Sequence, residues 1–139
     1  MRRPVLLICA LAALGGCRED DTTSVLAGCK DSGAVVAALS TAPAPVLLDG
    51  GPLSDCFASE RPSGGDIQLV GATMLEAAQQ LSEQSDAGAL GYLVGSLTRD
   101  PGHQHKFFAE AVRRVEQEAQ PFADKPTYER GLRAGRTSG

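Results

Sequence analysis

The two histidines of the chain, His103 and His105, are the residues whose type and spacing come closest to a metal site. Imidazole is a common zinc ligand, but most zinc sites take three or four protein ligands. The nearest carboxylates in the sequence are Asp100, which precedes a Pro-Gly turn, and Glu110. An extended segment would aim both imidazoles to one side, whereas a helix would separate them by about 200°. Metal binding by His103 and His105 is one hypothesis, beside a packing or capping role at a helix start and simple exposure.

The acidic residues between Asp49 and Asp66 do not form a recognisable catalytic motif. Asp49, Asp55, Glu60 and Asp66 are scattered through a segment rich in Pro, Gly and Ser, where Asp and Gly commonly form turns. Glycosidase-type catalysis needs two carboxylates held about 5–10 Å apart in a cleft, which the sequence does not place. The sequence also has no Gly-x-Ser-x-Gly elbow, phosphate-binding loop or EF-hand series. We therefore predict no catalytic residue, no cofactor and no enzymatic activity.

The first residues have the pattern of an export signal. Met1-Arg2-Arg3 is a positively charged start, and Val5 to Leu14 is an uncharged apolar run. This run is too short to cross a bilayer, which takes about 20 apolar residues. It ends in Leu14-Gly15-Gly16-Cys17, which resembles the lipobox of bacterial lipoproteins, with an aliphatic residue three positions before the cysteine and small residues directly before it. The alternative is an ordinary cysteine beside a conventional cleavage site.

The lipobox resemblance implies cleavage before Cys17 and a lipid on its thiol and amine, as S-diacylglyceryl and N-acyl groups. At about 0.8 kcal/mol per buried methylene, two or three chains hold a protein far more firmly than one myristoyl chain. Arg18, rather than Asp, follows the cysteine, which by resemblance to enterobacterial sorting favours an outer membrane. We expect a membrane-anchored, extracytoplasmic protein, on the periplasmic face of the outer membrane or at the cell surface. The paired arginines resemble twin-arginine signals, but Sec export is the expected route.

Two cysteines, Cys29 and Cys56, are left for the folded part once Cys9 is cleaved off and Cys17 is lipidated. In the oxidising compartment that the leader implies, we expect them to form a disulfide. A loop of this length restrains the unfolded chain by roughly 3–4 kcal/mol. A redox or catalytic thiol is the less favoured interpretation, because neither a CxxC spacing nor a nearby His is present.

The net charge of the chain argues against nucleic acid as a general class of partner. The sequence has 13 Lys and Arg against 17 Asp and Glu, a formal net charge of −4, and loss of Arg2 and Arg3 with the leader makes it more acidic. Such a domain has no general attraction for nucleic acid. A mild negative charge keeps a small domain soluble, and it would also suit a cationic protein partner.

The clearest helical pattern follows Asp66, where apolar residues recur in steps of three and four: Ile67, Val70, Met74, Ala77 or Ala78, and Leu81. A second helix is predicted to open at Asp86-Ala87-Gly88 and to end before Pro101, with a stripe of Leu90, Leu93, Val94 and Leu97. A third is predicted from about Gln104 to Gln120, with its apolar face at Phe108, Ala111, Val112, Val115 and Ala119.

Three glycines, Gly88, Gly91 and Gly95, fall within the second of these helices at a cost of about 1 kcal/mol each. We expect close backbone approach to a neighbouring helix to compensate. A membrane dimer through GxxxG is excluded, because the segment is too short and its context is that of a soluble domain.

Weaker signals mark the remaining elements. Asp31 or Ser32 is expected to cap a short helix with Val35, Val36 and Leu39 on its apolar face. The following irregular segment, 42–65, is expected to contain a turn at Asp49-Gly50-Gly51, a helical turn around Leu53 to Ala58 that holds Cys56, and a linker at Ser63-Gly64-Gly65. No hairpin is predicted. A last short helix with Tyr128 and Leu132 is expected to be capped by Asp124 or Thr127.

These elements predict an all-α fold, a small bundle of about four short helices packed antiparallel, with one long irregular segment pinned by the Cys29–Cys56 disulfide. The expected organisation is a signal peptide at 1–16, a lipidated N-terminus and tether at 17–28, a helical domain at 29–135 and a frayed tail at 136–139. The tether residues 18–24 span at most about 25 Å, so the domain is expected to lie close to the membrane.

Arg130, Arg133 and Arg136 lie three apart near the C-terminal end of the sequence. We expect them to complement a helix C-terminus and to pair with acidic neighbours, although such a stripe would also suit anionic lipid headgroups.

Three function classes remain open from the sequence. The first is a non-enzymatic protein-interaction or structural module of the cell envelope, whose protein partner is unidentified. The second is an acidic inhibitor or immunity-type lipoprotein directed against a cationic hydrolase. The third is a metal-binding protein that uses His103 and His105.

Overall fold

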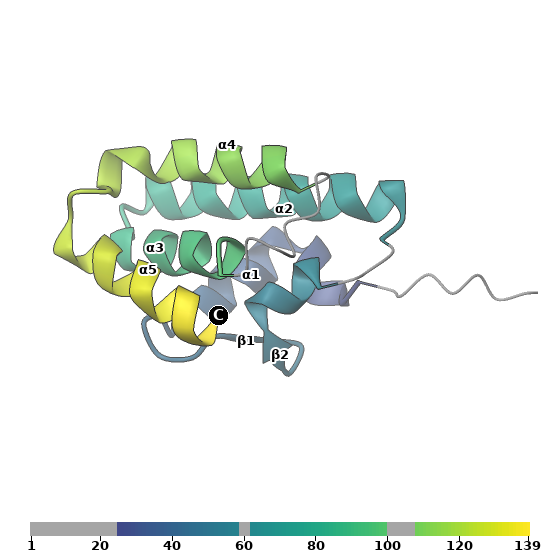
Figure 1. Cartoon of the computed structure of the whole chain (residues 1–139), viewed down its shortest axis with the longest axis horizontal. Helices are drawn as coiled ribbons and strands as arrows, with labels where there is room; N and C mark the ends of the chain where they lie inside the picture. The colour runs from purple at the N-terminus through teal and green to yellow at the C-terminus, as the bar shows by residue number, and fades with distance from the viewer. Residues whose placement is uncertain (1–24, 59–61, 100–107) are drawn as a thin grey trace, which may run out of the picture.

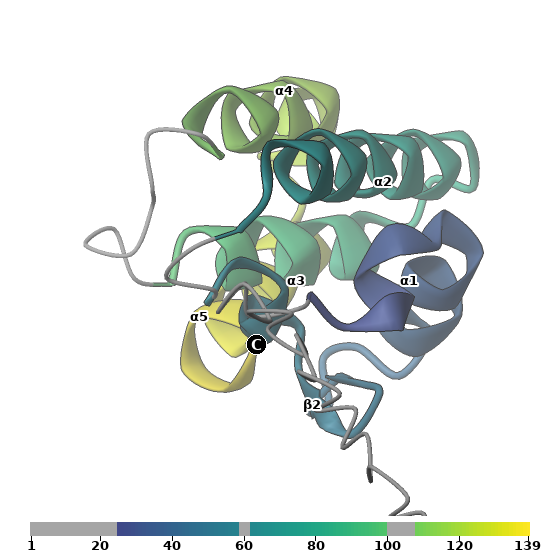
Figure 2. The same cartoon turned by 90° about the vertical axis from the view of Figure 1, so that its right-hand side faces the viewer.

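A computed structural model describes residues 25–58, 62–99 and 108–139. Within these ranges it has five α-helices: α1 (Ser32–Leu39), α2 (Gly64–Glu83), α3 (Ala87–Leu97), α4 (Ala109–Ala119) and α5 (Pro126–Ser138). The shorter elements are η1 (Ala27–Lys30), β1 (Leu47–Leu48), β2 (Gly51–Pro52), η2 (Leu53–Phe57) and η3 (Gln120–Phe122). Helices α2 and α4 lie side by side over a second layer of α3 and α5, with α1 beside α3 (Figures 1 and 2). The all-α prediction is confirmed.

Three helices begin at side-chain caps. The side chains of Asp31, Ser63 and Asp86 accept hydrogen bonds from the backbone N–H groups three residues later, and each bond is 3.0–3.1 Å long. These bonds satisfy donors that the first turn of a helix leaves unpaired. Asp31 and Asp86 are the expected caps, but Ser63 corrects the sequence interpretation, because Ser63-Gly64-Gly65 is a helix start rather than a linker.

The predicted apolar faces of α2 and α4 are buried. The buried residues of these faces are Val70, Met74, Ala77, Ala78 and Leu81 on α2, and Val112, Val115 and Ala119 on α4. In contrast, α3 is not the striped helix that was expected, because every residue of it except Gly88 is buried. α3 contacts each of the other four helices, so it is the central helix of the domain.

α3 and α5 pack through their glycines. A Cβ added at Gly91 or Gly95 of α3, or at Gly131 or Gly135 of α5, would lie within 3.0 Å of a backbone atom of the facing helix. This confirms the predicted close approach and identifies α5 as the neighbour. The order of contacts along the two helices, Gly88 with Gly131 and then Gly95 with Gly135, makes them parallel. The expectation of antiparallel packing is therefore wrong for this pair, because α4 returns the chain to the end where α3 began (Figure 1).

A small hairpin, which the sequence analysis did not predict, follows α1. β1 and β2 pair antiparallel, with Leu47 opposite Pro52 and Leu48 opposite Gly51. The connection lies at the predicted turn, where Asp49 and Gly50 have φ values of 51° and 84°. Two central residues with positive φ suit the twist of a two-residue hairpin turn. The strands are two residues long, which is too short for an alternating pattern to reveal them.

The folded part extends further in both directions than the predicted 29–135. Val25 is only 9% exposed and Gly28 is buried in η1, so residues 25–28 belong to the domain rather than to a tether. At the other end, α5 continues to Ser138 instead of fraying after residue 135. The backbone oxygen of Gly139 accepts hydrogen bonds from Ser54 Oγ at 2.9 Å and from Arg99 Nη1 at 2.5 Å. α5 begins after Lys125 without the side-chain cap expected from Asp124 or Thr127.

Candidate functional site

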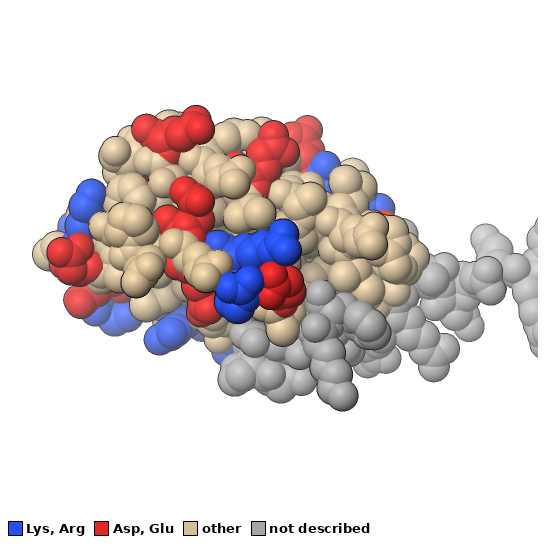
Figure 3. All heavy atoms as spheres, turned by 90° about the horizontal axis from the view of Figure 1, so that it is seen from above, with Lys and Arg blue, Asp and Glu red and all other residues tan. Residues whose placement is uncertain are grey.

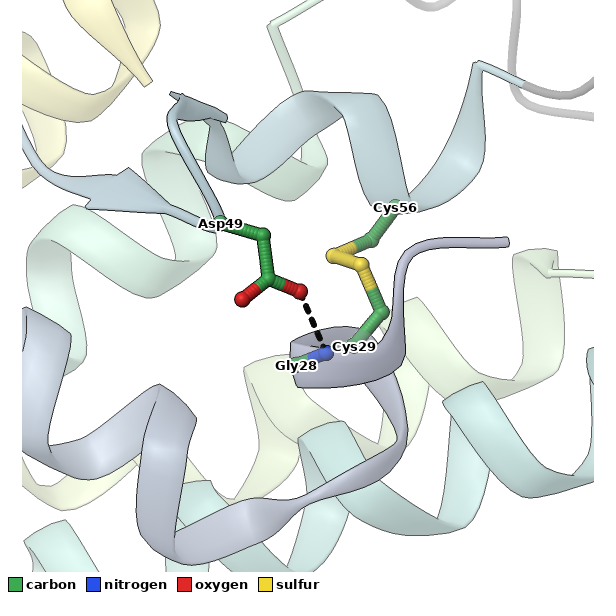
Figure 4. Close-up of a disulfide and its surroundings, with 4 residues drawn as sticks. All are labelled: Gly28, Cys29, Asp49 and Cys56. Atoms are coloured by element: carbon green, nitrogen blue, oxygen red, sulfur yellow. Dashed lines mark hydrogen bonds between the residues drawn. A yellow bond between two sulfur atoms is a disulfide. The ribbon is translucent and has the colours of Figure 1, made fainter. Parts of the chain in front are cut away.

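The predicted disulfide joins two short helical turns that are distant in sequence. Cys29 of η1 and Cys56 of η2 are bonded, and both residues are buried. Next to them, a carboxylate oxygen of Asp49, at the hairpin turn, accepts a hydrogen bond from Gly28 N at 2.7 Å (Figure 4). The hairpin, η1 and η2 are thus held together by one covalent and one polar link. This arrangement stabilises the fold, and the bonded sulfurs are not available as nucleophiles.

The other residues that the sequence singled out do not converge. Cys17, Glu60, His103 and His105 lie outside the described residues. Asp66 forms an ion pair with Lys30 at 2.6 Å, and its hydrogen bond with Lys30 lowers the pKa of its carboxyl group. Within residues 25–58, 62–99 and 108–139, no three His, Cys, Asp or Glu residues are grouped as metal ligands would be.

The outer face of α2 and α4 is rich in carboxylates. Glu76 and Glu83 of α2 and Glu116 of α4 are exposed. Figure 3 shows acidic side chains spread over this side of the molecule, with several basic groups among them. Exposed acidic groups on two adjacent helices form a surface that a cationic protein could contact.

A three-residue ion network also lies on α4. Glu110 accepts hydrogen bonds from Arg113 at 2.8 Å and from Arg114 at 2.9 Å. These hydrogen bonds, that from Arg113 first, lower the pKa of Glu110 to about 2. Because all three side chains are more than half exposed, the network mainly organises the surface.

Basic residues gather along α5, where Arg130, Arg133 and Arg136 are all exposed. Arg133 lies 3.7 Å from Glu129, and Arg136 is in the last turn of the helix. These positions confirm that Arg133 pairs with an acidic neighbour and that Arg136 complements the helix C-terminus. Arg130 has a different environment, because it lines a hollow in the surface.

This hollow, of about 480 Å³, lies where α3 and α5 begin. Its walls are the α2–α3 turn, the start of α5 and the 42–43 turn, and they include the charged residues Asp86, Lys125 and Arg130. We define these walls as the α3–α5 hollow. It is the candidate binding site of the described chain, because it combines a concave surface with polar and charged groups.

The α3–α5 hollow was not predicted from the sequence. It forms from three segments whose proximity depends on the parallel packing of α3 and α5. One signal was available, since Gly91 and Gly95 on one helix and Gly131 and Gly135 on the other have the same spacing of four residues.

No family model matches this chain, and neither does any curated protein or solved structure. In the described ranges, no helix has both the length and the apolar character that a membrane span requires.

Proposed function

We propose that this chain is a lipid-anchored, extracytoplasmic protein that acts as a non-enzymatic interaction or structural module of the cell envelope. The observation that carries the proposal is the buried Cys29–Cys56 disulfide, which joins η1 to η2. Disulfides of this kind form and persist outside the reducing cytoplasm. The leader and the resemblance of Leu14-Gly15-Gly16-Cys17 to a lipobox support the same compartment independently of the disulfide.

The position where the fold begins supports attachment close to the membrane. Val25 already belongs to the packed domain, so a lipid on Cys17 would be separated from the fold by residues 18–24. Seven residues reach at most about 25 Å when fully extended. A domain held at this distance would meet partners in the space next to the membrane.

The packing of the domain favours a role at its surface. The central helix α3 is surrounded by other elements, and its largest side chains, Tyr92, Leu90 and Leu93, are fully buried. Tyr92 also accepts a hydrogen bond through its hydroxyl oxygen from Val46 N at 3.0 Å. A packed interior of this kind is typical of a rigid domain that presents its outer faces to a partner.

Mass spectrometry of the protein isolated from its own cell envelope tests the proposed lipid anchor. We expect the chain to begin at Cys17 with a mass increase of a diacylglyceryl and an acyl group, and a Cys17→Ser variant to lose both the lipid and its sedimentation with membranes. The second variant, Cys9→Ser, is the matched control and is expected to be processed normally. An uncut leader or an unmodified Cys17 thiol would refute the proposed anchor.

Crosslinking in intact envelopes tests the proposed role. A reproducible protein adduct of the lipidated chain is expected, and it should disappear when an exposed contact residue is reversed in charge. If surface variants on every exposed face leave growth and all adducts unchanged, the interaction role is wrong.

A second candidate function, an acidic inhibitor of a cationic hydrolase, is favoured by the carboxylates on α2 and α4. The expected behaviour is inhibition of a basic cell-wall hydrolase that weakens as salt screens the charges. A Glu76→Lys, Glu116→Lys variant should lose this inhibition, whereas Arg133→Ala, on α5, should keep it. Lack of inhibition at low ionic strength across such hydrolases would refute this candidate.

A further inference from the structure

The α3–α5 hollow owes its shape to the parallel glycine contacts. Gly131 packs against the backbone of α3 at Gly88, and both residues line the hollow without adding side-chain volume. Because a Cβ at Gly131 would overlap the Gly88 carbonyl, the first turns of α3 and α5 lie in direct backbone contact beside the hollow.

Two cationic residues, Lys125 and Arg130, line this hollow. The Lys125 ammonium lies 4.4 Å from the centre of the Phe122 ring, which restricts where the charge can be. Arg130 forms neither an ion pair nor a side-chain hydrogen bond with any residue in the described part of the chain. An exposed guanidinium that has no protein partner remains available to an external anion.

The remaining polar groups of the hollow are one carboxylate and two hydroxyl residues. The charge of Asp86 opposes an anion, but its Oδ1 accepts the cap hydrogen bond from Ala89 N at 3.0 Å, and the two cationic residues leave the lining with a net positive charge. Ser85 and Thr127 add hydroxyl groups to the lining. Cationic and hydroxyl donors together are the usual partners of a phosphate group.

The hollow lies at the end of the domain opposite to the expected membrane attachment. In Figure 1 the first turns of α3 and α5 lie at one end of the long axis, and the earliest described residues lie at the other. A ligand would therefore reach the hollow from the space beyond the domain rather than from the bilayer to which the N-terminus leads.

We propose that the α3–α5 hollow binds a phosphate ester, held by Lys125 and Arg130 and by the hydroxyls of Ser85 and Thr127. A volume of about 480 Å³ exceeds what one phosphate group fills, so it leaves room for the organic part of the ester against Ala42 and Pro43. The ligand is a soluble or cell-wall phosphate ester and not a lipid headgroup. This inference goes beyond the proposed function and does not depend on lipidation of Cys17.

The test is titration of the full-length protein, in detergent micelles, with glycerol 3-phosphate, followed by NMR at the backbone amides of Gly88 and Gly131. We expect saturable shifts at both amides, and no shift with glycerol at the same concentration. Arg130→Ala should weaken binding at least about tenfold, since a charge-assisted hydrogen bond is lost. The matched control is Arg133→Ala, one turn further along α5 and outside the hollow, which should bind as the original chain does.

Flotation of the Cys17→Ser chain, which has no lipid anchor of its own, with phosphatidylglycerol and phosphatidylcholine vesicles distinguishes the sources of phosphate. Equally weak flotation of this chain with and without Arg130→Ala on both vesicles supports a soluble ligand. Flotation on phosphatidylglycerol that depends on Arg130, without glycerol 3-phosphate binding, would overturn the proposal. So would an absence of saturable shifts, or equal weakening by Arg130→Ala and Arg133→Ala, because either result shows only nonspecific attraction.

Discussion

Replacement of Gly135 by alanine should destabilise the domain strongly, although alanine is the better helix former. The added Cβ would overlap the carbonyl oxygen of Tyr92 and also approach Ser96 N to 2.9 Å. These are backbone atoms of a buried helix, so the two helices must separate to make room. Overpacking costs about 1–3 kcal/mol and sometimes more, and a backbone obstacle favours the upper end of this range. Against it stands a gain of about 1 kcal/mol in helix propensity, which leaves a net loss of about 2 kcal/mol.

The matched control is Gly64→Ala in the first turn of α2, where an added Cβ meets nothing within 4 Å. Circular dichroism melting of both variants gives the comparison. A loss of about 2 kcal/mol in a domain of this size lowers Tm by roughly 8 °C, whereas Gly64→Ala should leave Tm unchanged or slightly raised. If Gly135→Ala melts at the same temperature as Gly64→Ala, then the close parallel contact between α3 and α5 is not a feature of the folded protein.

Three further predictions concern polar and covalent links. A Cys29→Ser, Cys56→Ser variant should lose about 3.5 kcal/mol of unfolding free energy, measured by urea denaturation, because the cysteines are separated by 27 residues and the bond restrains that loop in the unfolded chain; a loss below about 1 kcal/mol would contradict this. Asp49→Ala should cost about 1 kcal/mol through the lost hydrogen bond to the η1 backbone, and Asp49→Asn, which keeps an acceptor, should recover most of it. The pKa of Glu110 is lowered to about 2 in the fold, so its stabilising contribution is complete above its ordinary pKa and is lost as the pH falls toward 2; NMR titration of its carboxyl carbon should show this pKa, and an Arg113→Ala variant should raise it toward 4.5.

The periodic elements of the fold could be predicted because their apolar residues repeat at the helical spacing. In α2, Val70, Met74 and Leu81 form a face that is recognisable without knowledge of what covers it. The disulfide was predicted from a compartment argument that leaves only one possible pairing, and it is present. Both inferences use local sequence or simple counting, and neither requires the topology.

What the sequence did not reveal depends on the arrangement of distant segments. Gly131 and Gly135 act as contact residues only beside α3, and their one signal in the sequence is the four-residue spacing that they share with Gly91 and Gly95. The hollow that includes Lys125 and Arg130 follows from that contact, so it could not be predicted before it. The hairpin could not be predicted for another reason, because two-residue strands are too short to show an alternating pattern.

The disulfide connects the stability of this domain to the compartment that we propose for it. Small domains are stable by about 5–15 kcal/mol in total, so a disulfide that contributes about 3.5 kcal/mol is a large part of that stability. The sequence contains no Trp, so the core is built from small and medium side chains such as Ala77, Val115 and Leu93. A chain kept in a reducing cytoplasm would therefore populate its unfolded state about 300-fold more than the oxidised chain, at about 1.4 kcal/mol per factor of ten. Pulse proteolysis of the reduced and oxidised protein measures this ratio directly, and equal cleavage of the two forms would refute the link between folding and export.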